Sequence, residues 1–234
     1  PMMSVVKFHQ GLATLNYLEK NKLSLSKKYV LKAGELDSDT YSPLRDKYPT
    51  GDITMSISEL LRYCIAESDN NVSNFLFDHI TSPKETEEYI QGLGVADISI
   101  RTTEAKMQAN HNNQYLNWTR PLAAAILFEK LRKENILSPK NEEFILKTLI
   151  STSTGANKIK GLLPANIVVG HKTGSSFRDQ GLKVADNDSG FVILPNGKSY
   201  SISIFVMNSM EDDTTNARIS AEISKAIFDY YSKK

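Results

Sequence analysis

Two side chains near the start of the sequence have the types and spacing of a nucleophile and its base. In the run PMMSVVKF, Ser4 and Lys7 lie three residues apart, so on a helix they share one face. A serine hydroxyl is a weak nucleophile until a base removes its proton, and lysine can be that base once burial or a nearby cation lowers its pKa. Ser24 and Lys27 repeat the spacing in a polar stretch typical of a solvated turn. The first pair alone therefore also fits an ordinary buried helix start.

A second polar group, Ser68-Asp69-Asn70, directly follows a predicted helix. Serine, aspartate and asparagine all favour capping turns, so one interpretation of this group is structural. In the functional interpretation, Ser68 relays a proton and Asn70 hydrogen-bonds an amide carbonyl. These residues alone leave both interpretations open.

The third group, Lys172-Thr173-Gly174, ends a predicted strand. Lys172 and Thr173 together could hold a carboxylate by charge and hydrogen bonding. Gly174 would let a ligand approach the strand backbone closely. The alternative is a lysine that merely protects an edge strand from pairing.

The first two thirds of the chain have helical periodicity. Apolar residues from Val5 to Leu18 recur at three- and four-residue steps, which predicts a helix with one buried face. Ser56 with Glu59, and Ser82 with Glu85, form capping boxes that predict two further helix starts. The runs TRPLAAAILFEKLRKEN and SPKNEEFILKTLI predict two more helices. Residues 100–117 are polar and aperiodic, and we expect a loop that is functional or disordered.

The last third changes to strand periodicity. NIVVGHKTG predicts one strand, and SGFVILPNGKSYSISIFVMN predicts two strands joined by a tight turn at Asn196-Gly197. A helix should follow over residues 214–231. We therefore predict an α/β (α+β) fold with a mostly helical domain over 1–157 and an antiparallel sheet with its C-terminal helix over 158–234. Such a sheet has three strands and one bare edge.

Composition limits the classes of function. The 234 residues include 28 basic and 27 acidic side chains, for a net charge of +1, which gives no reason to expect nucleic acid or an anionic membrane as partner. No apolar run is long enough to span a bilayer. The single cysteine, Cys64, excludes an intrachain disulfide and lies in an apolar helical run. The four scattered histidines lack metal-ligand spacing, so we expect no metal and no cofactor.

The order of the three groups is more specific than any one of them. Ser-x-x-Lys, Ser-Asp-Asn and Lys-Thr-Gly together are the signature of class A β-lactamases and penicillin-binding proteins. Essentially the whole chain resembles a class A serine β-lactamase. The runs PMMSVVKF, TEAKMQ, LNWT and GLLPANIVVGHKTG resemble most closely its divergent extended-spectrum, cephalosporin-hydrolysing branch.

This resemblance implies a two-domain fold and hydrolysis of the β-lactam amide bond through an acyl-serine intermediate, which confers antibiotic resistance. It implies a small-molecule β-lactam substrate, a monomer, and a periplasmic or secreted location. The family's first helix and first two strands precede the serine motif and have no counterpart in this chain, so we expect Pro1 to be an internal residue of the natural protein.

The resemblance also implies roles for the motif residues. Ser4 attacks the lactam carbonyl, Lys7 is its general base or proton relay, and Ser68 passes a proton to the departing nitrogen. The backbone N–H groups of Ser4 and Ser175 form the oxyanion hole. Asn70 binds the side-chain amide of the substrate.

Further implied roles concern the substrate and the second half of the reaction. Lys172 and Thr173 hold the substrate carboxylate beside Gly174, and Tyr41 flanks the mouth of the cleft. Glu104, in the aperiodic stretch, is the general base that activates water against the acyl-enzyme. The alternative for Glu104 is a solvated loop carboxylate.

The sequence departs from the family pattern in two places. The family usually has proline after the glutamate and asparagine at its fourth following position, where this chain has Ala105 and Gln108. The Gln108 amide could still hold the hydrolytic water, and loss of the proline removes the constraint of a cis peptide. An arginine that holds the substrate carboxylate in many members is replaced by Ser189, and we expect Lys158 to supply that charge. The alternative is a solvent-facing Lys158.

Three other functions remain open at this point. A penicillin-binding D,D-peptidase or transpeptidase shares the three motifs and releases penicillin slowly. A β-lactam sensor domain uses stable acylation as its signal and does not turn over. A purely structural protein would carry the ordered motifs by accident. Glu104 and its loop argue against the peptidase, the lack of a membrane anchor argues against the sensor, and the four ordered motif matches argue against a structural protein.

Overall fold

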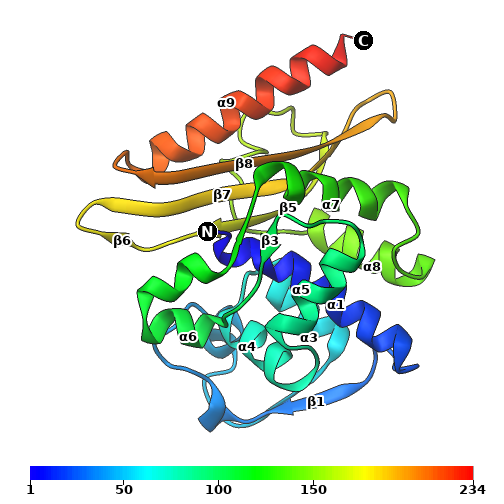
Figure 1. The fold of residues 1–234 in the computed structure, drawn as a ribbon, viewed down its shortest axis with the longest axis vertical. Coiled ribbons are helices and arrows are strands. Elements are labelled where there is room, and N and C mark those ends of the chain that lie inside the picture. The colour runs from blue at the N-terminus through cyan, green and yellow to red at the C-terminus, as the bar shows by residue number, and fades with distance from the viewer. Residues whose placement is uncertain (234) are drawn as a thin grey trace.

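The computed structural model describes residues 1–233 and has a helical part beside a sheet part (Figure 1). The helices are α1 (Val6–Lys20), α2 (Pro43–Lys47), α3 (Ile57–Ile65), α4 (Asn70–His79), α5 (Pro83–Gly92), α6 (Glu104–Ala109), α7 (Pro121–Lys133), α8 (Pro139–Ile150) and α9 (Asp213–Ser232), with short 3-10 turns η1 (Met3–Val5), η2 (Ala33–Glu35) and η3 (His111–Leu116). The strands are β1 (Lys28–Leu31), β2 (Ile53–Ser56), β3 (Ile98–Ser99), β4 (Trp118–Thr119), β5 (Val168–Ser175), β6 (Arg178–Asp179), β7 (Leu182–Ile193) and β8 (Ser199–Ser209). The predicted combination of helices with an antiparallel sheet is confirmed.

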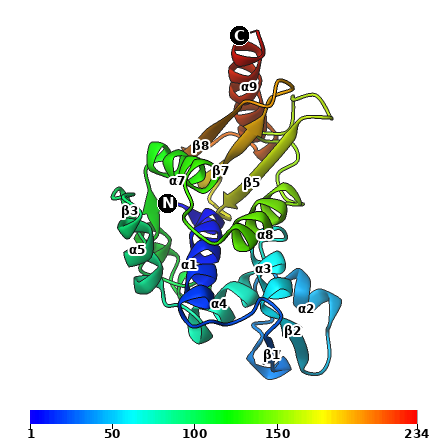
Figure 2. The ribbon, with the colours of Figure 1, turned by 90° about the vertical axis from the view of Figure 1, so that its right-hand side faces the viewer.

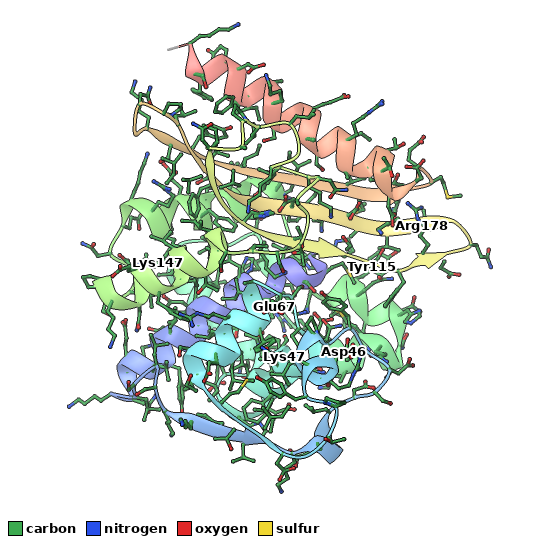
Figure 3. The ribbon with its side chains drawn as sticks, turned by 180° about the vertical axis from the view of Figure 1, so that it is seen from behind. Asp46, Lys47, Glu67, Tyr115, Lys147 and Arg178 are labelled. Atoms are coloured by element: carbon green, nitrogen blue, oxygen red, sulfur yellow. The ribbon has the colours of Figure 1, made fainter. Side chains whose placement is uncertain are left out.

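The main sheet is antiparallel and is centred on β7. Strand β5 pairs along one side of β7 and β8 along the other, and the predicted turn between β7 and β8 is confirmed, with Gly197 at φ +80°. Two-residue β6 also pairs with β7, so the sheet has one strand more than predicted. Arg178 of β6, labelled in Figure 3, forms an ion pair with Asp213 at 2.7 Å and so fastens this end of the sheet to the start of α9.

Helices cover both faces of the sheet. In Figures 1 and 2, α9 lies against β7 and β8 on the side away from the helical part. Because side chains alternate along a strand, Val192 of β7 joins the buried cluster that includes Phe228 of α9, and Phe191 joins the larger cluster on the other face. There Phe128 of α7 stacks on Phe8 of α1, with ring centroids 4.0 Å apart. The helix that follows Ser4 is thus packed against the rest of the core.

The predicted helix starts are confirmed. In both capping boxes the serine side chain accepts a hydrogen bond from the backbone N–H three residues later, and the glutamate returns one to the serine backbone. Each such cap stabilises its helix by about 1 kcal/mol. The boxes place the starts of α3 and α5, and α3 leads directly to the Ser68-Asp69-Asn70 group.

Two parts of the helical region differ from the prediction. Residues 100–117 contain α6 and η3, so the expectation of a structureless loop was wrong. Thr103 caps α6 by accepting from Lys106 N, but only Met107 of α6 is buried, so this short helix has no apolar period to detect. The helical part also holds two small antiparallel pairs, β1 with β2 and β3 with β4, which are too short to show alternation.

Three further observations bear on the classes of site. Within residues 1–233, no helix is both long and apolar enough to cross a membrane, and no group of three or more metal-ligating side chains is present. Cys64 is fully buried, and burial raises the pKa of its thiol to about 12. The thiol therefore stays protonated and unreactive.

Candidate active site

The Ser4–Lys7 pair is brought together by the turn that starts α1. Ser4 lies in η1, and Lys7 Nζ donates to Ser4 Oγ at 3.0 Å. Met3, just before the nucleophile, has φ +47°, a left-handed conformation that is strained for a non-glycine residue. Lys7 has no exposed surface. A buried lysine aimed at a serine hydroxyl favours a nucleophile with its base over an ordinary helix start, and the catalytic roles of both residues stay predictions.

Three further oxygen atoms surround the Lys7 ammonium. They are the Ser68 carbonyl at 2.8 Å, Asn70 Oδ1 at 2.5 Å and Glu104 Oε1 at 3.2 Å. A buried ammonium requires such partners, since burial without them is very unfavourable. Through Lys7, residues more than sixty positions apart in the sequence meet at the nucleophile.

The Ser68-Asp69-Asn70 group is both a cap and a part of the site. Buried Asp69 caps α4 by accepting from Val72 N at 2.9 Å, and it also accepts from Leu44 N at 2.8 Å. Burial raises the pKa of the Asp69 carboxyl in spite of these hydrogen bonds. Ser68 has φ +61°, in the left-handed region, and this turns its carbonyl and hydroxyl toward two different lysines. The structural interpretation is therefore confirmed, whereas the catalytic role of Ser68 and the binding role of Asn70 stay predictions.

Lys172 on β5 completes the link between the sheet and the helices. Its side chain is fully buried, and Nζ donates to Ser68 Oγ at 2.8 Å and to the Thr173 carbonyl at 2.9 Å. Burial and, to a smaller extent, the Lys7 charge lower the pKa of Lys172 to about 7. The alternative of a solvent-facing lysine that protects a strand edge is wrong. Thr173 Oγ1 lies 2.7 Å from Thr154 Oγ1, a neighbour that the sequence did not indicate.

Gly174 allows β5 to pack directly on the turn that carries the nucleophile. A Cβ atom at this position would lie 2.3 Å from the Met2 carbonyl oxygen and 3.0 Å from the Ser4 backbone nitrogen. Any side chain here would therefore force the strand and the turn apart. The close approach puts the end of β5, including Ser175, beside the backbone N–H of Ser4, as an oxyanion hole shared by the two residues requires.

Glu104, the first residue of α6, reaches the nucleophile. Its Oε1 lies 3.4 Å from Ser4 Oγ and its side chain is 10% exposed, so it is not a solvated loop carboxylate. A water molecule at an ordinary hydrogen-bond distance of about 2.8 Å from each of two oxygens so spaced can touch both.

Asn117 closes the segment that carries Glu104. Its Oδ1 accepts from Arg101 N at 2.8 Å and Thr102 N at 3.1 Å, and its Nδ2 donates to the Thr102 carbonyl at 3.0 Å. One buried amide thereby joins the two ends of the segment. Asn117 lies in the run LNWT that resembles the family, but no role could be predicted for it, because it is one of several asparagines in a polar stretch.

Gln108 and Tyr41 lie where the α6 segment meets the chain before α2. Gln108 Nε2 donates to the Asp39 carbonyl at 2.6 Å, so this N–H is bonded to the backbone, and the expected role of Gln108 in holding water stays a prediction. Tyr41 is 51% exposed, and its carbonyl accepts from Asn70 N at 3.0 Å. The described residues have no cis peptide bond, so the bond between Glu104 and Ala105 is trans, as expected without proline.

Lys158 lies at the sheet side of the site and is buried. Its Nζ forms an ion pair with Asp186 at 2.6 Å and donates to Ser175 Oγ at 3.0 Å. The alternative of a solvent-facing Lys158 is wrong. Ser189 of β7 pairs in register with Lys172, and its hydroxyl is hydrogen-bonded to Ser203. Asp186, like Thr154, was missed, because its partner is distant in sequence.

Comparisons with known proteins agree with this geometry. A family model described as "Beta-lactamase enzyme family" matches residues 1–231. The chain is 43% identical to a beta-lactamase of Bacteroides uniformis over 98% of this chain and 78% of that protein, and 37% identical to beta-lactamase VEB-1 of Pseudomonas aeruginosa over 100% and 79%. Among solved structures, a class A beta-lactamase from Bacteroides cellulosilyticus has a TM-score of 0.97 at 43% identity, covering 100% of this chain and 84% of that one. The TLA-3 extended-spectrum beta-lactamase also has a TM-score of 0.97 at 43% identity, covering 99% and 85%.

Proposed function

The chain belongs to the class A serine β-lactamases, enzymes that hydrolyse the β-lactam amide bond, and we propose that Ser4, Lys7, Ser68 and Glu104 perform that hydrolysis here. The observation that carries the proposal is the arrangement at Ser4 Oγ, which has Lys7 Nζ at 3.0 Å and Glu104 Oε1 at 3.4 Å. A nucleophile with two groups that can take its proton, one of them a carboxylate, suits both the formation and the breakdown of an acyl-enzyme.

In the acylation step, Ser4 Oγ forms a bond to the lactam carbonyl carbon. Its proton passes to Lys7 in the neutral form or, through a water molecule, to Glu104. The ring C–N bond then breaks, and the nitrogen takes the proton of the Ser68 hydroxyl. Lys172 Nζ, 2.8 Å from Ser68 Oγ, returns a proton to Ser68. The proton taken from Ser4 then replaces it on Lys172 through the solvent, so Lys7, Glu104 and Lys172 all regain their starting states.

The backbone N–H groups of Ser4 and Ser175 stabilise the charge that develops on the carbonyl oxygen. Donors fixed in this way before the reaction contribute about 10²- to 10³-fold each to the rate. The packing of Gly174 against the Ser4 turn supports this role, since it holds the strand end and the turn at a fixed separation.

In the deacylation step, Glu104 takes a proton from a water molecule, and the resulting hydroxide attacks the acyl carbon. The bond to Ser4 Oγ breaks, and the Ser4 oxygen takes up the proton that Glu104 removed from water, which restores the Glu104 carboxylate. Two sets of hydrogen bonds hold the Glu104 carboxylate in place for this step. Asn117 bonds across the base of the α6 segment, and Asn74 Oδ1 accepts from Ala105 N at 3.1 Å.

Substrate recognition falls to the residues that surround the nucleophile. Lys172, Thr173 and Ser175 bind the carboxylate beside Gly174, with Lys158 as a further positive charge. Asn70 binds the side-chain amide, and Tyr41 and Gln108 lie at the entrance. The similarity to extended-spectrum relatives supports cephalosporins and penicillins as substrates.

We further propose a monomer that acts in the periplasm or after secretion, with no nucleic-acid partner, and a domain boundary near residue 157. Export is the usual condition for an enzyme that meets cell-wall antibiotics. The balanced net charge of +1 supports the absence of a nucleic-acid partner.

The decisive experiment mixes the protein with a chromogenic cephalosporin and follows absorbance and intact mass together. We expect rapid multiple turnover by the native chain and a stable adduct on Ser4 in Glu104→Gln. A single long-lived adduct on the native chain would instead indicate a D,D-peptidase or a sensor. Normal turnover by Glu104→Gln would reject Glu104 as the deacylation base.

A further inference from the structure

The sheet side of the site contains a carboxylate of its own. Asp186 lies on β7 in register with Ser175 of β5, and its side chain is only 4% exposed. Its Oδ1 accepts from Ser175 Oγ at 2.5 Å and from Lys158 Nζ at 2.6 Å. A buried anion therefore lies beside residues to which we assign the binding of the substrate carboxylate.

The hydrogen bonds around Asp186 form a closed triangle. Lys158 Nζ also donates to Ser175 Oγ at 3.0 Å, and to the Asn187 carbonyl at 3.3 Å. The single hydroxyl proton of Ser175 is directed to Asp186, because the oxygen of Ser175 accepts from Lys158. Neither Ser175 nor Lys158 can donate fully to a second carboxylate without loosening its bond to Asp186.

Lys172 provides the contrast. It donates to a hydroxyl and a carbonyl, and among residues 1–233 no carboxylate forms an ion pair with its Nζ. The Lys158 charge is already balanced by Asp186, whereas the Lys172 charge is not. An incoming carboxylate thus meets one uncompensated cation and one cation with a resident anionic partner.

We propose that Asp186 determines specificity by competing with the substrate carboxylate for Lys158 and Ser175. The inference rests on the proposed function of these two residues in binding. With Asp186 in place, the substrate carboxylate contributes less to binding than the number of nearby hydrogen-bond donors suggests. The enzyme therefore discriminates only weakly between a β-lactam acid and its uncharged ester.

The test compares a chromogenic cephalosporin with its methyl ester in the native chain, Asp186→Asn, Lys158→Met and the double variant. Asp186→Asn retains the shape and removes the negative charge, so the KM for the acid should fall about five- to tenfold. The KM for the ester should change less than twofold. Lys158→Met leaves Asp186 unpaired beside the carboxylate and should raise the KM for the acid. The double variant should return the acid-to-ester ratio of KM values to near its native level.

Other outcomes overturn the inference. An acid-to-ester ratio unchanged in Asp186→Asn, or a KM raised equally for both compounds, would mean that Asp186 only maintains the structure. A thermal unfolding curve for each variant shows whether it is folded. If Asp186→Asn does not fold, the acid-to-ester ratio of KM values in Lys158→Met still tests the competition. Failure of the native chain to turn over the cephalosporin at all would overturn the proposed function, which is a separate result.

Discussion

The site has one buried lysine on its helical side and another on its sheet side, and the two differ in the charge of their partners. Lys7, on the helical side, is buried next to the Glu104 carboxylate, 3.2 Å away. Lys172, on the sheet side, is equally buried and donates to the Ser68 hydroxyl and the Thr173 carbonyl, which are neutral, and its pKa falls to about 7. The first arrangement keeps proton donors and acceptors together around the nucleophile. The second leaves an ammonium with which no carboxylate of residues 1–233 forms an ion pair, and this suits an anionic ligand. We therefore assign the nucleophile and its bases to the helical side and the substrate carboxylate to the sheet side.

Removal of Lys7 should have the largest effect, since it removes the centre of the helical side. We expect Lys7→Met to lower kcat/KM by at least about 10³-fold, the upper part of the range for general acid–base groups. Steady-state kinetics with a chromogenic cephalosporin would measure this. Lys27→Met, in the second Ser-x-x-Lys run, is the matched control because Lys27 is exposed. Similar losses in both variants would remove the special role of Lys7.

Adding a side chain at position 174 tests whether strand β5 must contact the turn that carries Ser4. Gly174→Ala forces β5 away from the Ser4 turn, and we expect kcat to fall about 10²-fold, the effect of losing one oxyanion donor. Gly34→Ala is the control, because a Cβ atom there meets nothing within 4 Å. An unchanged kcat in Gly174→Ala would show that the contact between strand and turn is dispensable.

The pH dependence of substrate binding tests the sheet side alone. Lys172 is charged below its pKa of about 7 and neutral above it, so the KM for a cephalosporin acid should rise severalfold as the pH passes 7 and then level off. The KM of the methyl ester should not follow this curve. Because the pKa of Lys172 in the folded chain lies below its unfolded value, its contribution to stability increases as the pH rises from about 7 to 10.5. Parallel curves for acid and ester would assign the titration to another group.

The smallest effect should come from a change at Asn117, which supports the Glu104 segment on the helical side. Asn117→Ala removes the bonds that close the Glu104 segment, and we expect about 1–3 kcal/mol less stability and a severalfold lower kcat. The acyl-enzyme should accumulate in intact-mass spectra, because deacylation depends on the position of Glu104. Asn112→Ala, at an exposed position of the same segment, is the control. Loss of stability without any adduct would confine Asn117 to a structural role.

Features that depend on neighbours in sequence could be predicted. A capping box needs only four consecutive residues, so Ser56 with Glu59 gave the start of α3 directly. The turn at Asn196-Gly197 was equally local. The order of the three motifs indicated the family. In the structure, Lys7 bonds to Ser4 and to Ser68, Glu104 lies 3.4 Å from Ser4, and Lys172 bonds to Ser68, so one chain of contacts links the motif residues.

Features that depend on tertiary packing could not be predicted. Asp186 meets Lys158 only because β7 pairs with β5 in one particular register, and Asp and Lys are common surface residues in any sequence. Asn117 acts through its amide on backbone groups fifteen positions away, which leaves no pattern in the side chains. The short helix α6 is stabilised by its cap and by contact with α4 rather than by an apolar face.

The Ser68 carbonyl accepts a hydrogen bond from Lys7 of the helical part, and the Ser68 hydroxyl accepts one from Lys172 of the sheet. A small rigid-body shift of the sheet relative to the helices would lengthen the second bond and leave the first unchanged. Delivery of the proton to the departing nitrogen, like the oxyanion hole between Ser4 and Ser175, therefore depends on a fixed position of the sheet relative to the helices. Warming or mild denaturant should slow turnover well before any secondary structure is lost.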